Sequence, residues 1–438
     1  PRAIRDVYKR QHVDDIPRIV HEAFYLANTG RKGPVVIDFP KDMGVLTSSA
    51  PLEEEVHLPS YQVTENPNKE DIQQLSQYLN HEKKPVVLAG AGINHSKSNA
   101  LLTEFVTQHQ IPVVTTLLGL GAISYENPLF LGMGGMHGSY ASNMALTECD
   151  LLINLGSRFD DRLASNPNEF APNAKVVHID IDESEINKVI PTTLGIVADC
   201  KKVLEALVTE HQSHATYKEW VDHCLDNKSK HPFKYKEAND TFCRPQEAIE
   251  YIGKITNGEA IVTTDVGQHQ MWSAQFYPFK HHSQWVTSGG LGTMGFGIPS
   301  AIGAQLAAPD KTVVCFVGDG GFQMTNQEMA LLPEYHLNVK IVLINNGTLG
   351  MVKQWQDKFF NQRFSHSVFN DQPDFIKMAE AYGVKSFLID HPNKLKAQLD
   401  EAFNYEGPAL IEVRISPAEP VNPMIPSGKA NHEMEGLE

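Results

Sequence analysis

The amino-acid sequence predicts an α/β fold with two doubly wound parallel-sheet domains and a smaller α/β segment before them. Strand-sized apolar runs alternate with helical patterns along the chain, which is the rhythm of βαβ units and parallel sheets. Many of these runs end in Gly, Asp or Asn, where open α/β sheets place their ligand contacts. The apolar fraction of 41% is sufficient for packed cores.

The expected strands are short apolar runs followed by turn residues or polar residues. They span residues 35–39, 86–88, 113–115, 151–155, 176–181, 260–264, 313–317, 339–344, 384–388 and 409–413.

Composition divides the chain into segments. Residues 1–46 contain one helix and one strand, which is too little for a domain, so they are interpreted as the end of a truncated one. The two doubly wound domains are expected at residues 69–208 and 244–416. A linker rich in Pro, Ser and Glu (47–68) precedes the first, and a polar linker (209–243) joins the two. The proline-rich tail (417–438) is expected to cross the surface or to cover a site.

Charge and cysteine content exclude several classes of protein. The net charge of −16, from 53 acidic and 37 basic residues, argues against a nucleic-acid surface. No apolar run approaches the roughly 20 residues of a membrane helix, and the mixed, charged start predicts no secretory signal. The five cysteines are widely spaced, so neither a disulfide framework nor a zinc site is expected. A cytoplasmic protein is favoured.

The most informative stretch is residues 313–346. It reads as a strand, then Gly318-Asp319-Gly320-Gly321, a helix starting near Thr325, and a strand that ends at Asn345-Asn346. The spacing is that of one βαβ step, which places a carboxylate and an amide oxygen at neighbouring strand ends. Mg²⁺ prefers a few such oxygens, with phosphate completing its shell. We therefore predict a metal-bridged diphosphate site, against the alternative of two ordinary βα loops.

This pattern resembles the thiamine-diphosphate signature of the decarboxylase and carboligase superfamily. The resemblance implies that Asp319 and Asn346 bind Mg²⁺, with Thr348 as a third ligand through its carbonyl oxygen. Gly320 and Gly321 would let the backbone approach the cofactor.

Two upstream runs resemble the acetohydroxyacid (acetolactate) synthases of that superfamily. They are residues 264–272 and the glycine-rich residues 288–297, for which a Rossmann loop is a weak alternative. The resemblance implies that the diphosphate is contacted by Val266, Gly267, Gln268 and His269. It also implies that the backbone at Gly292 and Met294 holds the aminopyrimidine and that the Met294 side chain lies beneath the thiazolium.

The segment 69–208 carries short motifs that mostly follow predicted strands. Each motif alone is more often structural, and Arg158 with Asp160 could be a surface ion pair. Together they resemble the FAD-binding domain of biosynthetic acetohydroxyacid synthases, and the run Arg158–Arg162 is the sharpest of them. The implied flavin-lining residues are Gly90, Thr116, Leu117, Met136, His137, Gly156, Arg158, Asp160, Asp180 and Ile181. The flavin is not redox-active in the family's main reaction.

On the substrate side, the resemblance places Met351 and Trp355 at the active-site entrance, where Trp355 favours larger second substrates. It places Lys41 and Arg162 at the substrate channel. For Lys41, a solvated charge at a strand end is an equal alternative.

The resemblance runs from about residue 13 to about residue 430, and residues 1–11 are interpreted as foreign sequence. It implies a central FAD-type domain, a C-terminal thiamine-diphosphate domain and, in residues 1–46, the remnant of a pyrimidine-binding domain. That domain carries the family's cofactor-activating Glu, so this chain by itself is expected to be inactive. Family members form homodimers or tetramers, and a small regulatory subunit is a further expected partner.

The expected function is acetolactate synthesis, the decarboxylative condensation of pyruvate with pyruvate or 2-ketobutyrate in branched-chain amino acid (isoleucine and valine) biosynthesis. Thiamine diphosphate, Mg²⁺ and FAD are the expected cofactors. Another thiamine-diphosphate carboligase or decarboxylase is one alternative, and a non-catalytic cofactor-binding fragment is another. A nicotinamide dehydrogenase is a distant third.

Overall fold

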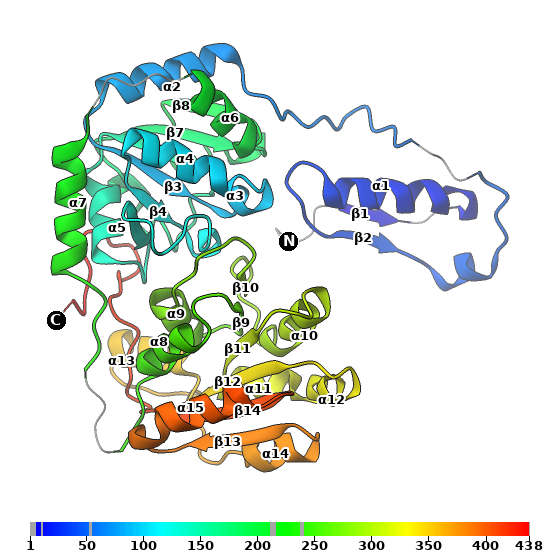
Figure 1. Cartoon of the computed structure of the whole chain (residues 1–438). Helices are drawn as coiled ribbons and strands as arrows, with labels where there is room; N and C mark the ends of the chain where they lie inside the picture. Colours follow the sequence, from blue (N-terminus) through cyan, green and yellow to red (C-terminus); the bar gives the residue numbers. More distant parts are fainter. Residues whose placement is uncertain (1–5, 10–11, 52–54, 211–215, 237–240, 438) are drawn as a thin grey trace.

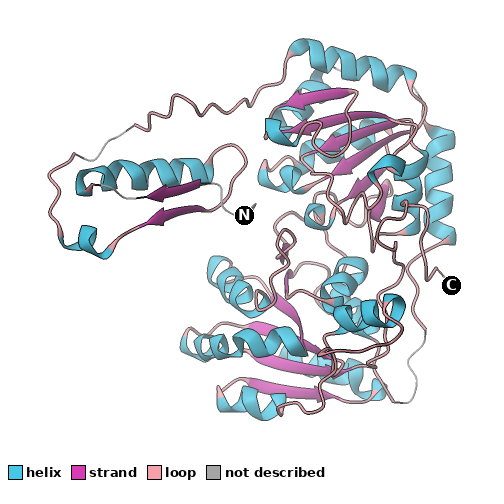
Figure 2. Cartoon of the chain, turned by 180° about the vertical axis from the view of Figure 1, so that it is seen from behind, coloured by secondary structure: helices cyan, strands magenta, loops and turns pink. Residues whose placement is uncertain are grey.

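The computed structural model describes residues 6–9, 12–51, 55–210, 216–236 and 241–437. These residues form an N-terminal βαβ unit, a central unit and a C-terminal unit (Figure 1). Both larger units are parallel sheets layered with helices, as the view from behind shows (Figure 2). The α/β prediction with two doubly wound sheets is thereby confirmed.

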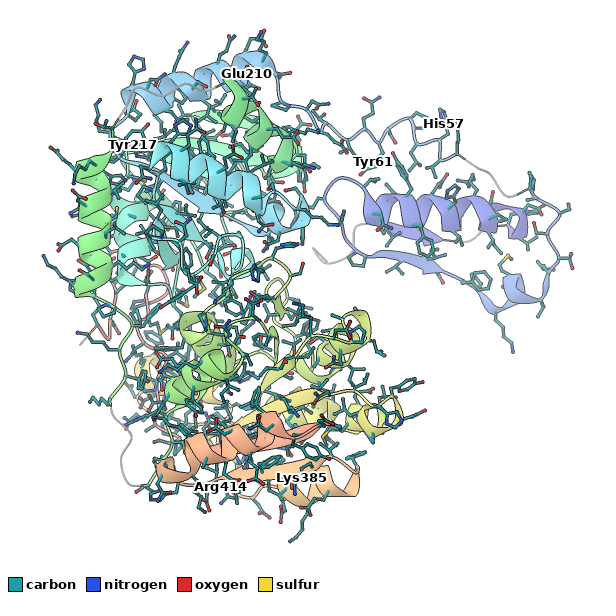
Figure 3. All side chains as sticks on the ribbon, viewed as in Figure 1. His57, Tyr61, Glu210, Tyr217, Lys385 and Arg414 are labelled. Carbon is teal, nitrogen blue, oxygen red and sulfur yellow. The ribbon has the colours of Figure 1, made fainter. Side chains whose placement is uncertain are left out.

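The N-terminal unit pairs two parallel strands, β1 (Asp6–Lys9) and β2 (Val35–Asp38), beside helix α1 (Ile16–Asn28). Strand β1 was not predicted, and it falls within the residues interpreted as foreign. Arg31 joins the unit to the central one, because its Nη1 contacts Asp182 Oδ2 at 2.9 Å and Glu185 Oε1 at 2.8 Å. The following linker returns past α1, where the rings of Tyr61 and Tyr25 meet edge to face at 6.1 Å (Figure 3).

The central unit is a six-stranded parallel sheet in the order β5-β4-β3-β6-β7-β8. Because the chain moves from β3 outward to β5 and then returns to β6, ligands are expected in the crevice between the ends of β3 and β6. The strands are β3 (Pro85–Ala89), β4 (Val113–Thr115), β5 (Phe130–Met133), β6 (Leu151–Leu155), β7 (Lys175–Asp180) and β8 (Leu194–Val197). One helical layer holds α2 (Lys69–His81), α3 (Ala91–His95), α4 (Asn99–His109) and α6 (Cys200–Glu210), and another holds α5 (Tyr140–Glu148) and α7 (Lys218–Lys230).

The C-terminal unit is a second six-stranded parallel sheet, in the order β10-β9-β11-β12-β14-β13. Its switch point lies between β9 and β11, since β10 lies on the far side of β9. The strands are β9 (Ile261–Thr264), β10 (Trp285–Thr287), β11 (Val313–Gly318), β12 (Val339–Asn345), β13 (Lys385–Ile389) and β14 (Ala409–Arg414). The helices are α8 (Pro245–Ile255), α9 (Gln268–Phe276), α10 (Gly297–Ala307), α11 (Asp319–Thr325), α12 (Leu331–Glu334), α13 (Gly350–Phe359), α14 (Phe375–Ala381) and α15 (Leu395–Asn404).

Short 3-10 helices complete the structure. They are η1 (Val13–Asp15), η2 (Lys41–Val45), η3 (Leu117–Gly119), η4 (Pro167–Glu169), η5 (Glu183–Glu185), η6 (Asn326–Ala330) and η7 (Pro392–Lys394).

Two local expectations are corrected by the structure. The helix after β11 does not start near Thr325: α11 begins at Asp319 and ends at Thr325. The early start is possible because Gly321 packs against Asp265, where an added Cβ would lie 2.4 Å from Oδ1. The polar stretch 209–243 is not simply a connection either, because it contains α7, whose Trp220, Val221 and Cys224 are buried.

The tail after β14 runs back over both larger units (Figure 1). Val421, Met424, Ile425 and Ala430 are buried, and the backbone N–H of Ile425 donates to the Met136 carbonyl at 2.8 Å. The tail therefore joins the C-terminal unit to the central one. In the part of the chain that the structure describes, no helix is long and apolar enough to cross a membrane.

Candidate active site

A cavity opens at the carboxyl edge of the C-terminal sheet. It lies at the switch point between β9 and β11, where doubly wound sheets bind ligands. Its walls come from the loops after β9, β11 and β12 and from the glycine-rich loop before α10. The lining residues are Val266, Gly267, Gln268, His269, Trp272, Met294, Gly318, Asp319, Gly320, Gly321, Ile344, Asn346, Thr348, Leu349, Gly350, Met351 and Val352.

Three helices begin at this cavity: α9 at Gln268, α11 at Asp319 and α13 at Gly350. The residue that precedes each helix provides no side-chain cap, although in α11 the Asp319 carboxylate accepts from the Gly320 N–H at 2.9 Å. The first N–H groups of a helix have no partner within the helix and carry a partial positive charge, so a helix start favours anions. Three such starts around one cavity suit a ligand with several negatively charged oxygens.

Asp319, Asn346 and Thr348 come together at one side of the cavity. Asp319 follows β11 and Asn346 follows β12, and these strands pair in parallel. The Thr348 backbone N–H donates to Asn346 Oδ1 at 3.0 Å. Asp319 is only 2% exposed, and burial raises the pKa of its carboxyl to about 6. A cation beside this carboxylate would offset the cost of burying its charge.

The cation would need oxygen ligands other than clustered carboxylates. Over the described ranges, no group of three or more His, Cys, Asp or Glu residues could hold a metal. One carboxylate, neutral protein oxygens and phosphate oxygens are the ligand set that suits Mg²⁺. The residues present therefore fit a magnesium–diphosphate pair.

Two buried polar atoms at the cavity support a polar ligand. Thr348 Oγ1 and His269 Nε2 are buried and accept or donate no hydrogen bond in the structure. Burial lowers the pKa of His269 to about 4, so the ring is neutral at pH 7. Because unpaired buried polar atoms cost free energy, these two are better satisfied when a ligand is bound.

Two residues that support the site were not predicted. Asp265 is fully buried, and its carboxylate accepts hydrogen bonds from the backbone N–H groups of Val266, Gly295 and Gly297. It thus ties the loop after β9 to the glycine-rich loop. Gln372 Nε2 donates to Asp319 Oδ2 at 2.8 Å, from a loop well downstream.

Comparisons with known proteins agree with this geometry. Residues 265–413 match the family described as "Thiamine pyrophosphate enzyme, C-terminal TPP binding domain", and residues 72–207 match its "central domain". The chain is 52% identical over 430 residues to the acetolactate synthase large subunit of Lactococcus lactis, covering 98% of this chain and 74% of that protein. The chain belongs to the acetolactate synthase large-subunit family.

Other members of the family are similar along nearly the whole chain. The large subunit of acetolactate synthase isozyme 2 of Escherichia coli is 40% identical over 428 residues, covering 97% of this chain and 76% of that protein. The large subunit of Haemophilus influenzae is 41% identical over 429 residues, 96% of this chain and 75% of that protein. The likeness to the Lactococcus lactis subunit, at 98% of the chain, extends beyond the expected limits of residues 13–430.

The structure brings most of the predicted thiamine-diphosphate residues of this synthase chain to the cavity. Val266, Gly267, Gln268, His269 and Met294 line it, as do Gly320, Gly321 and Met351. Gly292 is exposed in the glycine-rich loop with φ +74°, a conformation suited to glycine. Trp355 lies one turn beyond Met351 on α13, with its ring 5.3 Å from that of Phe359, and does not line the cavity.

The predicted flavin residues of the chain lie at the carboxyl edge of the central sheet. Gly90, Thr116, Gly156 and Asp180–Ile181 follow or end β3, β4, β6 and β7, and Met136–His137 lie shortly after β5. Gly90 and Gly156 meet at the switch point, where a Cβ on Gly90 would lie 2.3 Å from the Gly156 carbonyl oxygen. Packing alone therefore explains these two glycines.

The other predicted flavin residues divide into buried and partly exposed ones. His137 is buried, burial lowers its pKa to about 4, and its Nδ1 lies 3.2 Å from the Pro423 carbonyl oxygen of the tail. Arg158 and Asp160 form a long ion pair of 3.9 Å, and Leu117 begins η3. These contacts are compatible with both the structural and the ligand-binding interpretation.

Lys41 and Arg162 are not brought to the cavity. Lys41 is exposed at the start of η2 in the N-terminal unit, and Arg162 is exposed and contacts Asp161 at 3.3 Å. Neither residue lines the cavity. Their assignment to a substrate channel stays a prediction.

Proposed function

We propose that this acetolactate synthase chain binds thiamine diphosphate with Mg²⁺ at the β9–β11 switch point and condenses pyruvate, with loss of CO₂, with pyruvate or 2-ketobutyrate. The main observation in its support is that α9, α11 and α13 all begin, without a cap from the preceding side chain, at one cavity. Asp319 and Asn346 line the same cavity. When bound, thiamine diphosphate supplies the carbon nucleophile and the electron sink.

Each protein group has a separate part in this proposal. Asp319 and Asn346 hold Mg²⁺ through side-chain oxygens, and Thr348 holds it through its carbonyl oxygen. The backbone at Gly267–His269 and Gly320–Gly321 binds the diphosphate. Met294 supports the cofactor from below, since it lines the cavity beside Gly320. Met351 and Trp355 on α13 bound the substrate side, where Trp355 selects the second keto acid by packing.

FAD is proposed to bind along the carboxyl edge of the central sheet. Its support is the strand order, which is that of dinucleotide-binding folds, and the proposed site includes Gly90 and Gly156 at the switch point. The remaining contacts are proposed for Thr116, Leu117, Met136, His137, Arg158, Asp160, Asp180 and Ile181.

The assembly is proposed as a homodimer or tetramer in the cytoplasm, with a small regulatory subunit as a further partner. The relatives' name, "large subunit", supports the last point. The proposed domains are residues 1–46, a central domain that begins at residue 69 and includes α7 (Lys218–Lys230), and residues 244–416, with the tail at 417–438. In the N-terminal unit, Lys41 is proposed to act at the substrate channel together with Arg162.

The test is acetolactate formation from pyruvate with thiamine diphosphate, Mg²⁺ and FAD omitted one at a time. The chain is assayed alone and with a pyrimidine-binding domain supplied as a second polypeptide. We expect acetolactate only when all three cofactors are present. Asp319→Ala should lower it by more than the roughly 10–100-fold that loss of an outer-sphere partner costs.

Asp310→Ala is the matched control, because Asp310 is an exposed carboxylate just before β11 in the same unit. It should retain full activity. Acetaldehyde and CO₂ without acetolactate would instead assign a decarboxylase. Bound cofactors without any turnover of pyruvate in the mixture would contradict the synthase proposal.

A further inference from the structure

The orientation of the Asn346 side chain decides whether it can hold a cation. Only the carbonyl oxygen of an amide is a metal ligand, and the amide can turn either end toward the ion. In the structure, Asn346 Nδ2 donates to Gln268 Oε1 at 3.1 Å, and Asn346 Oδ1 accepts from the Thr348 backbone N–H at 3.0 Å. Gln268 therefore holds the Nδ2 end of the Asn346 amide, and this leaves Asn346 Oδ1 on the opposite side.

Gln268 has the same ambiguity, and two acceptors resolve it. Its Nε2 donates to Gln354 Oε1 at 2.9 Å and to the backbone carbonyl of Glu419 at 3.0 Å. Since both partners accept, Nε2 must face them, and Oε1 is left to face Asn346. Gln268 is 5% exposed, so water cannot readily replace these partners.

Gln354 is in turn oriented by the backbone of the tail. Its Oε1 accepts from the Val421 N–H at 2.9 Å, and its Nε2 donates to the Val421 carbonyl at 3.2 Å. A backbone N–H cannot accept and a carbonyl cannot donate, so this two-point contact allows one amide orientation only. Gln354 is 7% exposed, the one buried residue of α13, and it lies one turn beyond Gly350 and Met351, which line the cavity.

The amides of Gln268 and Asn346 meet against the start of α13. A Cβ on Gly350 would lie 2.0 Å from Gln268 Oε1 and 2.5 Å from Asn346 Nδ2. These two amides fill the space beside Gly350. If one amide were turned around, the other would therefore have to change its orientation too.

We propose that Gln354 is a positioning residue. The backbone of Val421 in the tail orients the Gln354 amide, and Gln354, acting through Gln268, directs the Asn346 oxygen toward the cation. The proposal rests on the Mg²⁺–diphosphate site of the proposed function. It makes the tail part of that site, although no tail residue lines the cavity.

The test is calorimetric titration of the whole chain with Mg²⁺ at saturating thiamine diphosphate, which requires no turnover. Gln354→Met keeps the length of the side chain and removes both of its polar ends. We expect the Mg²⁺ Kd to rise by about 10-fold or more, the usual effect of losing an outer-sphere partner.

Gln305→Met is the matched control. Gln305 is also a buried amide of the C-terminal unit, 3% exposed, and its Nε2 donates to the carbonyls of Ala308, Pro309 and Lys311. Its loss should destabilise the fold and leave the Mg²⁺ Kd unchanged. A similar rise in Kd in both variants would show a general packing effect and overturn the proposal.

A double mutant tests the route through Gln268. If Gln354 acts through Gln268, Gln354→Met should add little to the effect of Gln268→Leu, whereas independent effects would add. An unchanged Kd in Gln354→Met, with the parent chain binding Mg²⁺, would overturn this inference alone. A parent chain that binds neither Mg²⁺ nor thiamine diphosphate would overturn the proposed cofactor site and this inference with it.

Discussion

Asp180 is a carboxyl group held in the core of the central unit, where it is 7% exposed. Burial raises its pKa from 3.8 to about 6, although the Asp182 backbone N–H and Arg31 oppose the rise. Between these two values the folded chain binds more protons than the unfolded chain. The free energy of unfolding should therefore fall as the pH rises through this window.

Asp180→Asn should remove that fall. A shift of about two pKa units corresponds to roughly 3 kcal/mol, so the variant should be more stable than the parent at pH 7 and comparable near pH 4. Urea unfolding of both chains, without flavin, between pH 4 and 7 measures the difference. Parallel pH profiles for the two proteins would contradict the prediction.

The position of single residues at the cavity was predicted best where they follow a strand. Asp319, Asn346 and His269 stand next to buried apolar runs, and the carboxyl ends of parallel strands meet at one edge. Gln372 could not be predicted in this way, because it lies in a long loop before α14 with no periodic pattern to place it. Asp265 stood in a predicted motif, but its bonds to Gly295 and Gly297 depend on how two loops pack.

In the helices α10 and α11, glycine has opposite roles. Gly303 lies in α10 with nothing within 4 Å of an added Cβ, and it is exposed. Gly303→Ala should therefore stabilise the chain by about 0.5–1 kcal/mol, because Ala has the higher helix propensity. Thermal unfolding measures this, and a destabilised variant would show that the helix needs its glycine.

Gly321 in α11 should tolerate no such change. A Cβ there would lie 2.4 Å from Asp265 Oδ1, a carboxylate that holds three backbone N–H groups. Gly321→Ala should displace α11 from β9 and weaken thiamine-diphosphate binding by at least about 10-fold. Intrinsic fluorescence during cofactor titration measures the affinity, with Gly303→Ala as the control. Equal affinities in the two variants would count against the contact.

The predicted strands all exist in the structure, with ends within one residue, because each is a compact apolar run. The strands that were missed lack this signal. β5 contains Gly132 at φ +115° and an irregular register, β8 is an edge strand with a central Gly195, and β10 has three half-buried residues. All three are edge strands of only three or four residues, too short for their composition to stand out in the sequence.

The tail links the central unit to the C-terminal unit. Besides its contacts with Gln268 and Gln354, it reaches the central unit, where Asn431 Nδ2 donates to Asn143 Oδ1 and the Leu163 carbonyl at 3.2 Å each. Gln275 of α9 donates to the carbonyls of both His137 and Asn422. The sequence predicted that the tail would cross the surface or cover a site, and it does run over both units.

Deletion of residues 417–438 should therefore uncouple the two larger units. Buried apolar tail residues and the partners of several buried amides would be lost, and each unpaired amide costs about 1–3 kcal/mol. Calorimetry should show a lower Tm and two separate transitions in place of one. A single transition at the parent temperature would show that the sheets are coupled without the tail.

The starts of α9, α11 and α13 have a consequence for handling the protein. Without its cofactor, the chain has the partial positive charges of these helix starts at one cavity, beside the Asp319 carboxylate, and a small multivalent anion would offset them. Whatever binds only the folded chain stabilises it by mass action. Phosphate, sulfate and inorganic diphosphate in a buffer should therefore raise the melting temperature and, at the same time, compete with reconstitution, so that the most protective storage buffer becomes the poorest assay buffer.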